Sequence, residues 1–266
     1  MFTPEDRDEL RDALVAAART DGRISGAALT GSGAVGATDR WSDVDLALGV
    51  ASAADLGRVV ADWTDRMYRT HEAVHHVDVV HERILYRVFL LASTLQVDLA
   101  FWPAVEFGAT GPTFRLLFGT ANERPPRPAP SAAELIGMGW LYALHVRSSI
   151  ARGRPWQAEY MLSGARDQVL ALACLRHGVS VVEGRGIDSL PLEVTAAMTG
   201  ALIHSLDAAE LGRAFGIVSE ALIAETERVD ADLANRLAAP LRELVDSVPL
   251  GAPDGELGRS RSRHRF

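Results

Sequence analysis

Two aspartates stand in this sequence at a spacing that suits a divalent metal ion. Asp43 and Asp45 are two positions apart, and the residues that alternate with them, Val44, Leu46 and Leu48, are apolar. In a β-strand this alternation would put both carboxylates on one face and the apolar side chains in a core. Neighbouring like charges disfavour each other's ionised form, and a hard cation such as Mg²⁺, which prefers oxygen ligands, relieves that conflict.

A glycine-rich turn lies upstream of the aspartates. Gly31, Ser32 and Gly33 follow an apolar run at residues 24–30, which we predict to be a strand. Glycine lets backbone N–H groups approach a phosphate closely, and the Ser32 hydroxyl can donate to a phosphate oxygen. Taken singly, Gly-Ser-Gly is often only a turn, and Asp-x-Asp only a solvated strand edge. Their succession predicts metal-assisted phosphate chemistry, as in transfer from a nucleoside triphosphate.

The same residues resemble a known signature. An apolar strand, Gly-Ser, and then a strand reading Asp-apolar-Asp-apolar are typical of the polymerase-β-like nucleotidyltransferase superfamily, and the resemblance covers about residues 20–105. The matching residues are Gly31, Ser32, Gly36, Ser42, Asp43, Val44, Asp45 and Leu46. Many relatives carry Arg at the position of Val35, so this chain departs from the pattern at one triphosphate contact.

The resemblance also implies a third carboxylate, on a later strand and flanked by apolar residues. Asp98, inside the apolar run 95–101, fits that description. Asp78, inside the run 76–80, is the rival. It comes earlier in the strand order than the resemblance implies, and we therefore favour Asp98.

The resemblance further implies how the site would work. Asp43, Asp45 and Asp98 would hold two Mg²⁺ ions, with ATP as the co-substrate. AMP would pass to a hydroxyl of a small molecule, and pyrophosphate would leave. The expected nucleotide-binding residues are Gly31, Ser32, Gly33, Ser42 and Arg166. By length and by its helical second half, the chain is most similar to nucleotidyltransferases that modify aminoglycoside or lincosamide antibiotics. That narrower likeness implies a small, cationic acceptor and a role in antibiotic resistance.

The first half of the chain alternates helical and strand patterns. Apolar residues recur at helical spacing in some segments and at strand spacing in others. We predict helices at 4–19 and 53–70, and strands at 24–30, 44–50, 76–80, 85–91 and 95–101. This order indicates an α+β fold, in which a small mixed β-sheet with helices forms a catalytic domain over residues 1–121.

The second half is predicted to be a helical bundle. Residues 122–130 contain four prolines and would form an extended linker. Ser131 and Glu134 have the spacing of a capping box at the start of the first helix. The helices are expected at 131–150, 155–176, 191–204, 207–229 and 231–246. They would make a substrate-binding domain over residues 131–250, followed by a disordered basic tail over residues 251–266.

One polar stripe interrupts the apolar pattern of the helix at 155–176. Glu159, Ser163 and Arg166 recur at helical spacing. In one interpretation the stripe faces the active site, where Arg166 meets the triphosphate and Glu159 binds a cationic acceptor or serves as a reserve base. In the other, Glu159 and Arg166 only contact each other on a solvated face.

The charge and composition exclude several classes of protein. The net charge is −8 and all 27 cationic residues are arginine, so a mechanism that needs a lysine is excluded. An acidic chain disfavours nucleic acid as a partner, because such binding depends on phosphate neutralisation. The single cysteine, Cys174, cannot form an internal disulfide. No apolar run reaches the roughly 20 residues of a membrane helix, and we expect a cytoplasmic protein with no membrane partner.

A non-catalytic function is the alternative. A nucleotidyltransferase-like protein can serve as an antitoxin or a regulatory partner, or can modify a protein. The presence of all three carboxylates favours an enzyme, because a purely binding role does not require them. The sequence leaves the acceptor, the nucleotide preference and the oligomeric state open.

Overall fold

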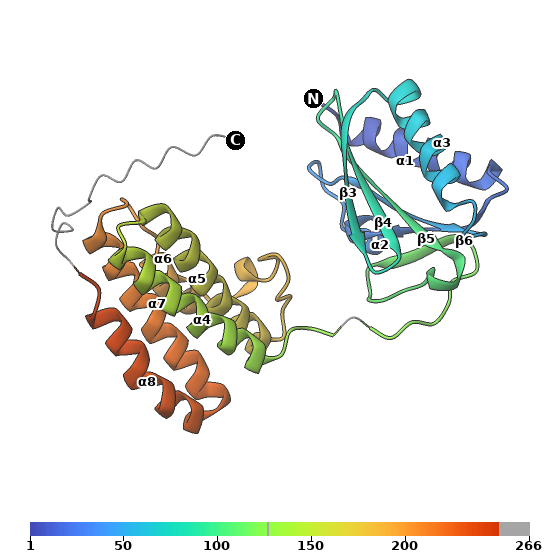
Figure 1. Cartoon of the computed structure of the whole chain (residues 1–266). Helices are drawn as coiled ribbons and strands as arrows, with labels where there is room; N and C mark the ends of the chain where they lie inside the picture. Colours follow the sequence, from blue (N-terminus) through green and yellow to red (C-terminus); the bar gives the residue numbers. More distant parts are fainter. Residues whose placement is uncertain (127, 250–266) are drawn as a thin grey trace. The chain divides into compact units, whose positions relative to one another are not determined.

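The chain folds into two compact units. The computed structural model describes residues 1–126 and 128–249, and the chain divides between Met1–Pro128 and Ala129–Phe266 (Figure 1). The predicted tail at 251–266 lies outside the described residues. None of the described helices combines the length and the apolar character needed to cross a membrane.

The first unit contains the sheet. Its helices are α1 (Pro4–Thr20), α2 (Gly31–Val35) and α3 (Leu56–Thr70), with a 3₁₀ turn, η1, at Ala104–Glu106. Its strands are β1 (Ile24–Thr30), β2 (Val44–Val50), β3 (Ala73–His81), β4 (Ile84–Leu91), β5 (Gln96–Pro103) and β6 (Phe114–Gly119). The strands form one sheet in the order β3-β4-β5-β2-β1-β6. Only β2 and β5 pair in parallel, so the sheet is mixed and the α+β prediction is confirmed.

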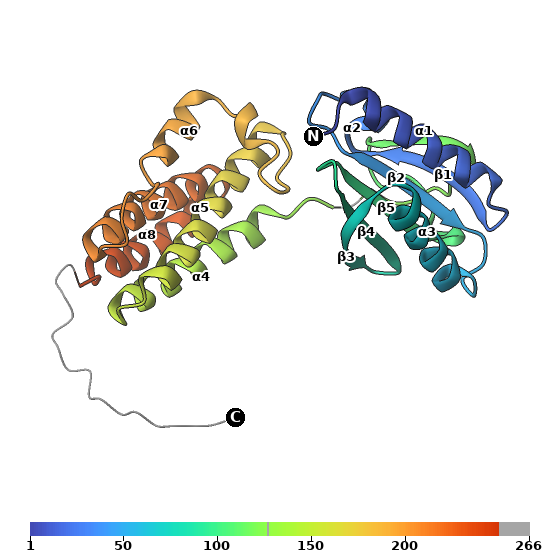
Figure 2. The ribbon, with the colours of Figure 1, turned by 90° about the horizontal axis from the view of Figure 1, so that it is seen from above.

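The two faces of the sheet have different partners. Both α1 and α3 pack on one face, where they bury Val44, Leu46, Val97 and Leu99 (Figure 2). Side chains alternate across a strand, so the residues between these point to the other face. That face carries a smaller apolar cluster around Trp102, together with the aspartates of β2 and β5. The helices therefore leave the face of the aspartates uncovered.

Several elements differ from the sequence-based predictions. Strand β6 was not predicted, because it is an edge strand that depends on pairing with β1 across a long separation in sequence. The glycine segment, predicted as a turn, forms the five-residue helix α2. The helix predicted at 53–70 begins at Leu56, and the helix predicted at 191–204 ends at Thr199, where Gly200 follows.

The second unit is helical. It consists of α4 (Ala132–Ala151), α5 (Pro155–His177), α6 (Leu192–Thr199), α7 (Ala208–Val229) and α8 (Ala231–Asp246), with a 3₁₀ turn, η2, at Ile187–Ser189. The capping box predicted before α4 is confirmed, since the Ser131 hydroxyl accepts from the Glu134 amide and the Glu134 carboxylate accepts from the Ser131 amide. α5 contacts α4, α6 and α7, and α7 contacts α8, around a single apolar core.

A half-buried carboxylate after α1 links Arg23 to α3 and gives a test of the fold. Asp21, after α1, accepts two hydrogen bonds of 2.9 Å from Arg23 and one of 3.1 Å from the Trp63 indole on α3. The Arg23 bonds, more than that of Trp63, lower the pKa of Asp21 to about 2. A depressed pKa stabilises the folded state above the unfolded value near 4, and this stabilisation disappears as the pH falls through about 2.

We therefore expect Asp21→Asn to lower the free energy of unfolding at pH 7 by about 1 to 2 kcal/mol, measured by urea denaturation. Asp12→Asn is the control, because Asp12 makes an exposed ion pair with Arg11 on the same helix. This control should change stability by less than about 0.5 kcal/mol. Equal effects of the two substitutions would contradict the role assigned to Asp21.

Candidate functional site

Three aspartates meet on the uncovered face of the sheet. Asp45 in β2 lies directly opposite Asp98 in the parallel strand β5, and Asp43 stands just before β2 begins. One carboxylate oxygen from each of the three lies within 4.8 Å of the others. All three side chains are half-buried. The parallel pairing of two strands that are distant in sequence is therefore what brings the carboxylates together.

An amide side chain bridges two of the carboxylates. Gln96 donates from its Nε2 atom to Oδ1 of Asp98 at 3.0 Å and to Oδ2 of Asp43 at 3.2 Å. Gln96 and Asp98 are two positions apart in β5, and therefore share a face. The sequence-based prediction missed Gln96, although this spacing was visible in the sequence. Its neutral donor partly compensates two acidic groups without occupying all their oxygens.

The environment of Asp98 favours the neutral form of its carboxyl more than water does. Burial, the larger cause, and the nearby charge of Asp43 raise the pKa of Asp98 to about 6, against the lowering effect of the Gln96 hydrogen bond. A divalent cation among the oxygens would reverse this preference, because it favours the ionised form of each ligand. The donor set is entirely oxygen, which suits Mg²⁺. The residues therefore fit a hard metal ion.

Gly31 brings the glycine segment against the carboxylates. Its φ of 57° lies in the left-handed region, and a Cβ atom at this position would overlap the Asp45 carboxylate. Glycine is thus required both by the backbone conformation and by the close approach. Gly36, with φ of 70°, ends α2 in the same left-handed region but would have open space around a Cβ atom.

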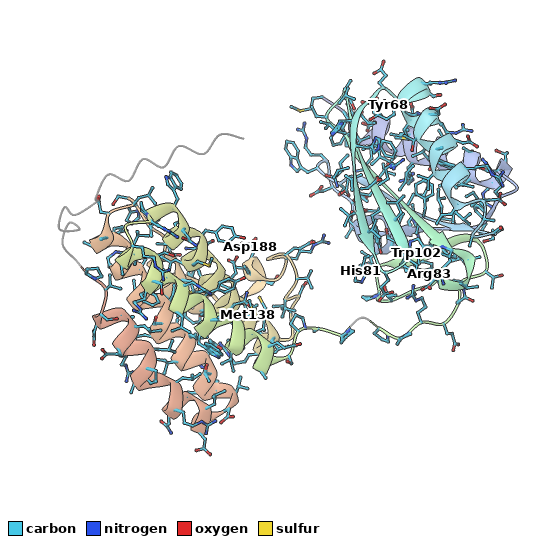
Figure 3. All side chains as sticks on the ribbon, viewed as in Figure 1. Tyr68, His81, Arg83, Trp102, Met138 and Asp188 are labelled. Atoms are coloured by element: carbon cyan, nitrogen blue, oxygen red, sulfur yellow. The ribbon has the colours of Figure 1, made fainter. Side chains whose placement is uncertain are left out.

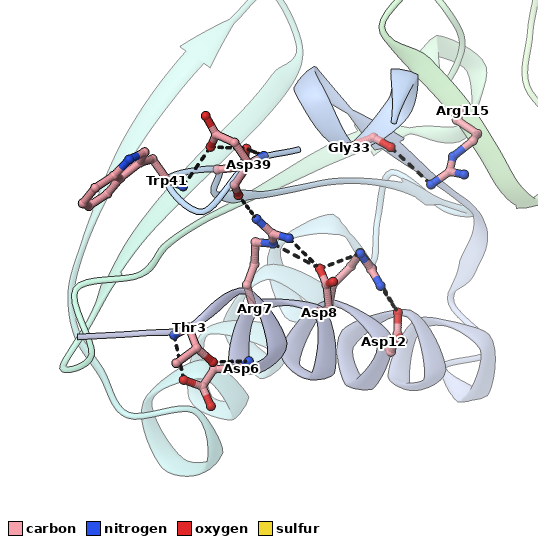
Figure 4. A network of polar contacts seen from close by, with 11 residues as sticks. Thr3, Asp6, Arg7, Asp8, Asp12, Gly33, Asp39, Trp41 and Arg115 are labelled. Atoms are coloured by element: carbon pink, nitrogen blue, oxygen red, sulfur yellow. Dashed lines mark hydrogen bonds and ion pairs between the residues drawn. The ribbon is translucent and has the colours of Figure 1, made fainter. Parts of the chain in front are cut away.

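A network of hydrogen bonds holds the loop between α2 and β2. Asp39 accepts from the Trp41 amide at 2.8 Å and from the Ser42 hydroxyl at 3.1 Å, while the Asp39 carbonyl accepts from the buried Arg7 of α1 (Figure 4). These bonds fix the loop that leads into Asp43. The hydroxyl of Ser42, expected to bind the nucleotide, is occupied here in the turn.

A hollow opens beside the aspartates. It has a volume of about 270 Å³, and Asp43, Gln96 and the exposed Trp41 are among its lining residues. Its wall is mixed, since the apolar Phe2 and Leu95 line it together with polar side chains. A small molecule in this hollow would contact Asp43, the one aspartate of the cluster that lines it. Neither the hollow nor Trp41 was predicted from the sequence, because the loop that forms them is ordered by contacts with α1.

The rival candidates lie elsewhere in the sheet. Asp78 on β3 accepts two hydrogen bonds of 2.6 Å from Arg87 and is not part of the aspartate cluster. The hydroxyl of Tyr68 lies 2.9 Å from Nδ1 of His76, whereas His81 lies at the opposite end of the sheet (Figure 3). Among the described residues, the three aspartates are the one group of at least three His, Cys, Asp or Glu side chains that could hold a metal.

The two site residues predicted in the helical half both lie on α5, in the second unit. Arg166 donates to the Ser163 hydroxyl at 2.8 Å and to the Ala201 carbonyl at 3.4 Å. One carboxylate oxygen of Glu159 is buried without a hydrogen-bond partner, and no ion pair joins it to Arg166 within the described chain. Glu159 and Arg166 therefore do not form the direct contact that the alternative interpretation predicted. Their roles toward a ligand remain predictions.

Comparisons with known proteins give a structural likeness only. No family model matches the chain, and no curated protein matches it. Among solved structures, the chain is similar to an aminoglycoside 6-adenyltransferase from Bacillus subtilis, with 13% sequence identity and a TM-score of 0.37. The match covers 90% of this chain and 98% of that one. At this degree of similarity, the function proposed below rests on the geometry of the aspartates.

The raised pKa of Asp98 gives a stability test. A carboxyl whose folded pKa lies above its unfolded value destabilises the folded state as the pH rises from about 4 to about 6. We expect Asp98→Asn to raise the free energy of unfolding at pH 8 in EDTA by about 1 to 2 kcal/mol, and to have little effect at pH 4. Thermal unfolding across this pH range measures both.

Asp78→Asn serves as the matched control for that measurement. Arg87 lowers the pKa of Asp78, so this substitution should destabilise the protein at neutral pH rather than stabilise it. The two variants remove the same charge from the same sheet. If both destabilise the protein at pH 8, Asp98 does not carry the electrostatic cost assigned to it.

Substitutions of Gly31 and Gly36, which both have left-handed backbone conformations, distinguish the effect of backbone strain from that of the contact with Asp45. Gly31→Ala and Gly36→Ala should each cost about 1 to 2 kcal/mol for the backbone conformation. Gly31→Ala should cost more, and should also abolish binding of a divalent cation, because its methyl group displaces the Asp45 carboxylate. Calorimetric titration with Mn²⁺ checks this difference. Unchanged cation binding in Gly31→Ala would refute the close approach.

Proposed function

We propose that this protein is a metal-dependent nucleotidyltransferase that transfers a nucleoside monophosphate, AMP from ATP, to a hydroxyl of a small molecule. The observation that carries the proposal is the cluster of Asp43, Asp45 and Asp98, packed against a glycine whose backbone lies on the Asp45 carboxylate. A phosphate bound along the glycine segment would therefore lie next to the metal ligands. This juxtaposition is what transfer from a nucleoside triphosphate requires.

Each group has a defined role in this proposal. Asp43, Asp45 and Asp98 would hold Mg²⁺, which supplies charge stabilisation for the phosphates and lowers the pKa of the attacking hydroxyl. The backbone of Gly31–Gly33 and the Ser32 hydroxyl would bind phosphate oxygens. The Ser32 hydroxyl has no hydrogen bond to another described residue, so it is available for this. Gln96 keeps two of the carboxylates in place while the metal ions are absent.

The proton of the acceptor hydroxyl needs a base close to the metal. Asp98 is the proposed acceptor of this proton, because its carboxylate belongs to the aspartate cluster beside which the hydroxyl would bind. Glu159 is the reserve candidate. The proposed acceptor is a small, cationic molecule such as an aminoglycoside-like antibiotic, supported by the acidic net charge of −8.

Nucleotide binding is the first consequence to measure. Mg²⁺ and ATP together should raise the melting temperature of the wild type by roughly 5 to 10 °C at a hundred times the dissociation constant, because binding then adds about 2.7 kcal/mol and each 1 kcal/mol shifts the melting temperature by about 2 to 4 °C in a chain of this size. Asp45→Asn should abolish this shift. It should also reduce pyrophosphate release with a panel of hydroxyl compounds by more than about a hundredfold. Mutation of a residue that only hydrogen-bonds to a metal ligand already lowers metal affinity or activity by about 10- to 100-fold, and Asp45 would be a ligand itself.

Asp78→Asn is again the control, because Asp78 lies outside the aspartate cluster. This variant should keep the nucleotide shift and the pyrophosphate release of the wild type. Normal turnover in Asp45→Asn would contradict the proposed function. A wild type that binds no nucleoside triphosphate with Mg²⁺ would also contradict it, and would favour a non-catalytic partner protein.

A further inference from the structure

Arg115 occupies an unusual position beside the glycine segment. It belongs to β6, where it lies opposite Leu29 in the antiparallel pairing with β1. Because β1 leads directly into Gly31, this register puts Arg115 next to the start of α2. Its guanidinium donates from Nη2 to the carbonyl of Gly33 at 3.2 Å (Figure 4).

Among the described residues, no acidic side chain compensates the charge of Arg115. No carboxylate among the described residues lies within 4.0 Å of its guanidinium nitrogens, whereas Arg23, Arg87 and Arg124 in the same unit are each ion-paired. The Arg115 side chain is exposed, and its bond to the Gly33 carbonyl uses one of five donors. The remaining donors can therefore reach a ligand.

The sheet order gives the glycine segment two chemically opposite neighbours. β1 lies between β2 and β6, so the segment at its end is flanked by Asp45 on one side and by Arg115 on the other. Residues 31–39 themselves contain no cationic side chain. Leu29, which lies opposite Arg115, belongs to the core on the helix-covered face, so Arg115 reaches the segment from that face at Gly33, whereas Asp45 contacts Gly31 from the other face. A polyphosphate that begins at the aspartates and passes along the glycine segment at the end of the sheet would reach the Arg115 guanidinium.

We propose that Arg115 binds the β- and γ-phosphates of the nucleoside triphosphate and stabilises the charge on the leaving pyrophosphate. This inference rests on the function proposed above and adds a residue that the glycine motif does not contain. The planar guanidinium can form two parallel hydrogen bonds to phosphate oxygens, and such charge-assisted pairs are stronger than neutral ones. Its bond to the Gly33 carbonyl holds the side chain in place before the nucleotide arrives.

Binding of ATP and AMP to Arg115→Gln separates this role from a structural one. Calorimetry with Mg²⁺ should show an ATP affinity about 10- to 100-fold weaker than that of the wild type, because a charge-assisted contact is lost. AMP has no β- or γ-phosphate, so its affinity should be unchanged. Arg115→Lys should recover part of the ATP affinity, because it restores the charge without the paired donors.

Arg19→Gln is the matched control. Arg19 also donates to a backbone carbonyl of β6, that of Leu117 at 3.0 Å, but it comes from the end of α1 and stacks on Phe118. This variant should bind ATP and AMP as the wild type does. If Arg115→Gln binds ATP normally while Asp45→Asn does not, the role of Arg115 is overturned and the proposed function stands.

Two further results would also overturn the inference. An equal loss of ATP and AMP affinity in Arg115→Gln would mean that Arg115 only supports the fold of the glycine segment. A wild type that binds neither nucleotide would remove the proposed function and the role of Arg115 together.

Discussion

The site depends on the repulsion among three carboxylates that the sheet holds together. Parallel pairing of β2 and β5 fixes Asp45 opposite Asp98, and the loop before β2 adds Asp43. Backbone hydrogen bonds of the two strands oppose the separation of these side chains. The conflict is relieved in part by the Gln96 amide and in part by the raised pKa of Asp98. A divalent cation would relieve it fully. The same arrangement therefore destabilises the protein when the site is empty and favours the binding of a cation.

The remaining parts of the first unit serve this arrangement. The helices α1 and α3 cover the opposite face, so the core of the sheet is built without shielding the aspartates from solvent. Arg7 is buried and bonded to the Asp39 carbonyl, and so connects α1 to the loop that leads into Asp43. Because Gly31 lacks a Cβ atom, α2 can begin in direct contact with the Asp45 carboxylate. Packing on one face of the sheet thus determines the geometry of charges on the other.

Much of this unit was predictable from the sequence, and the reason is local. Strands β1 and β2 were predicted with the bounds that they have, because their apolar alternation depends on residues within each strand. Strand β6, Gln96 and Arg115 were missed because their importance depends on pairing between distant segments. A glutamine on a strand looks like any solvent-facing residue until the strand opposite is known. In the second unit, the cap at Ser131 could be predicted for the same local reason.

The order of charges across the sheet also suggests a direction for the proposed reaction. The carboxylates that are proposed to bind a cation come from β2, β5 and the loop before β2. The guanidinium of Arg115, which has no ion pair among the described residues, comes from β6, and the glycine segment lies at the end of β1 between them. Under the proposed function, the bond that breaks lies at the aspartates and the pyrophosphate leaves toward Arg115. The charge that develops on the pyrophosphate would therefore move toward the guanidinium, which attracts it. Such a fixed gradient favours the transition state without any rearrangement of the protein.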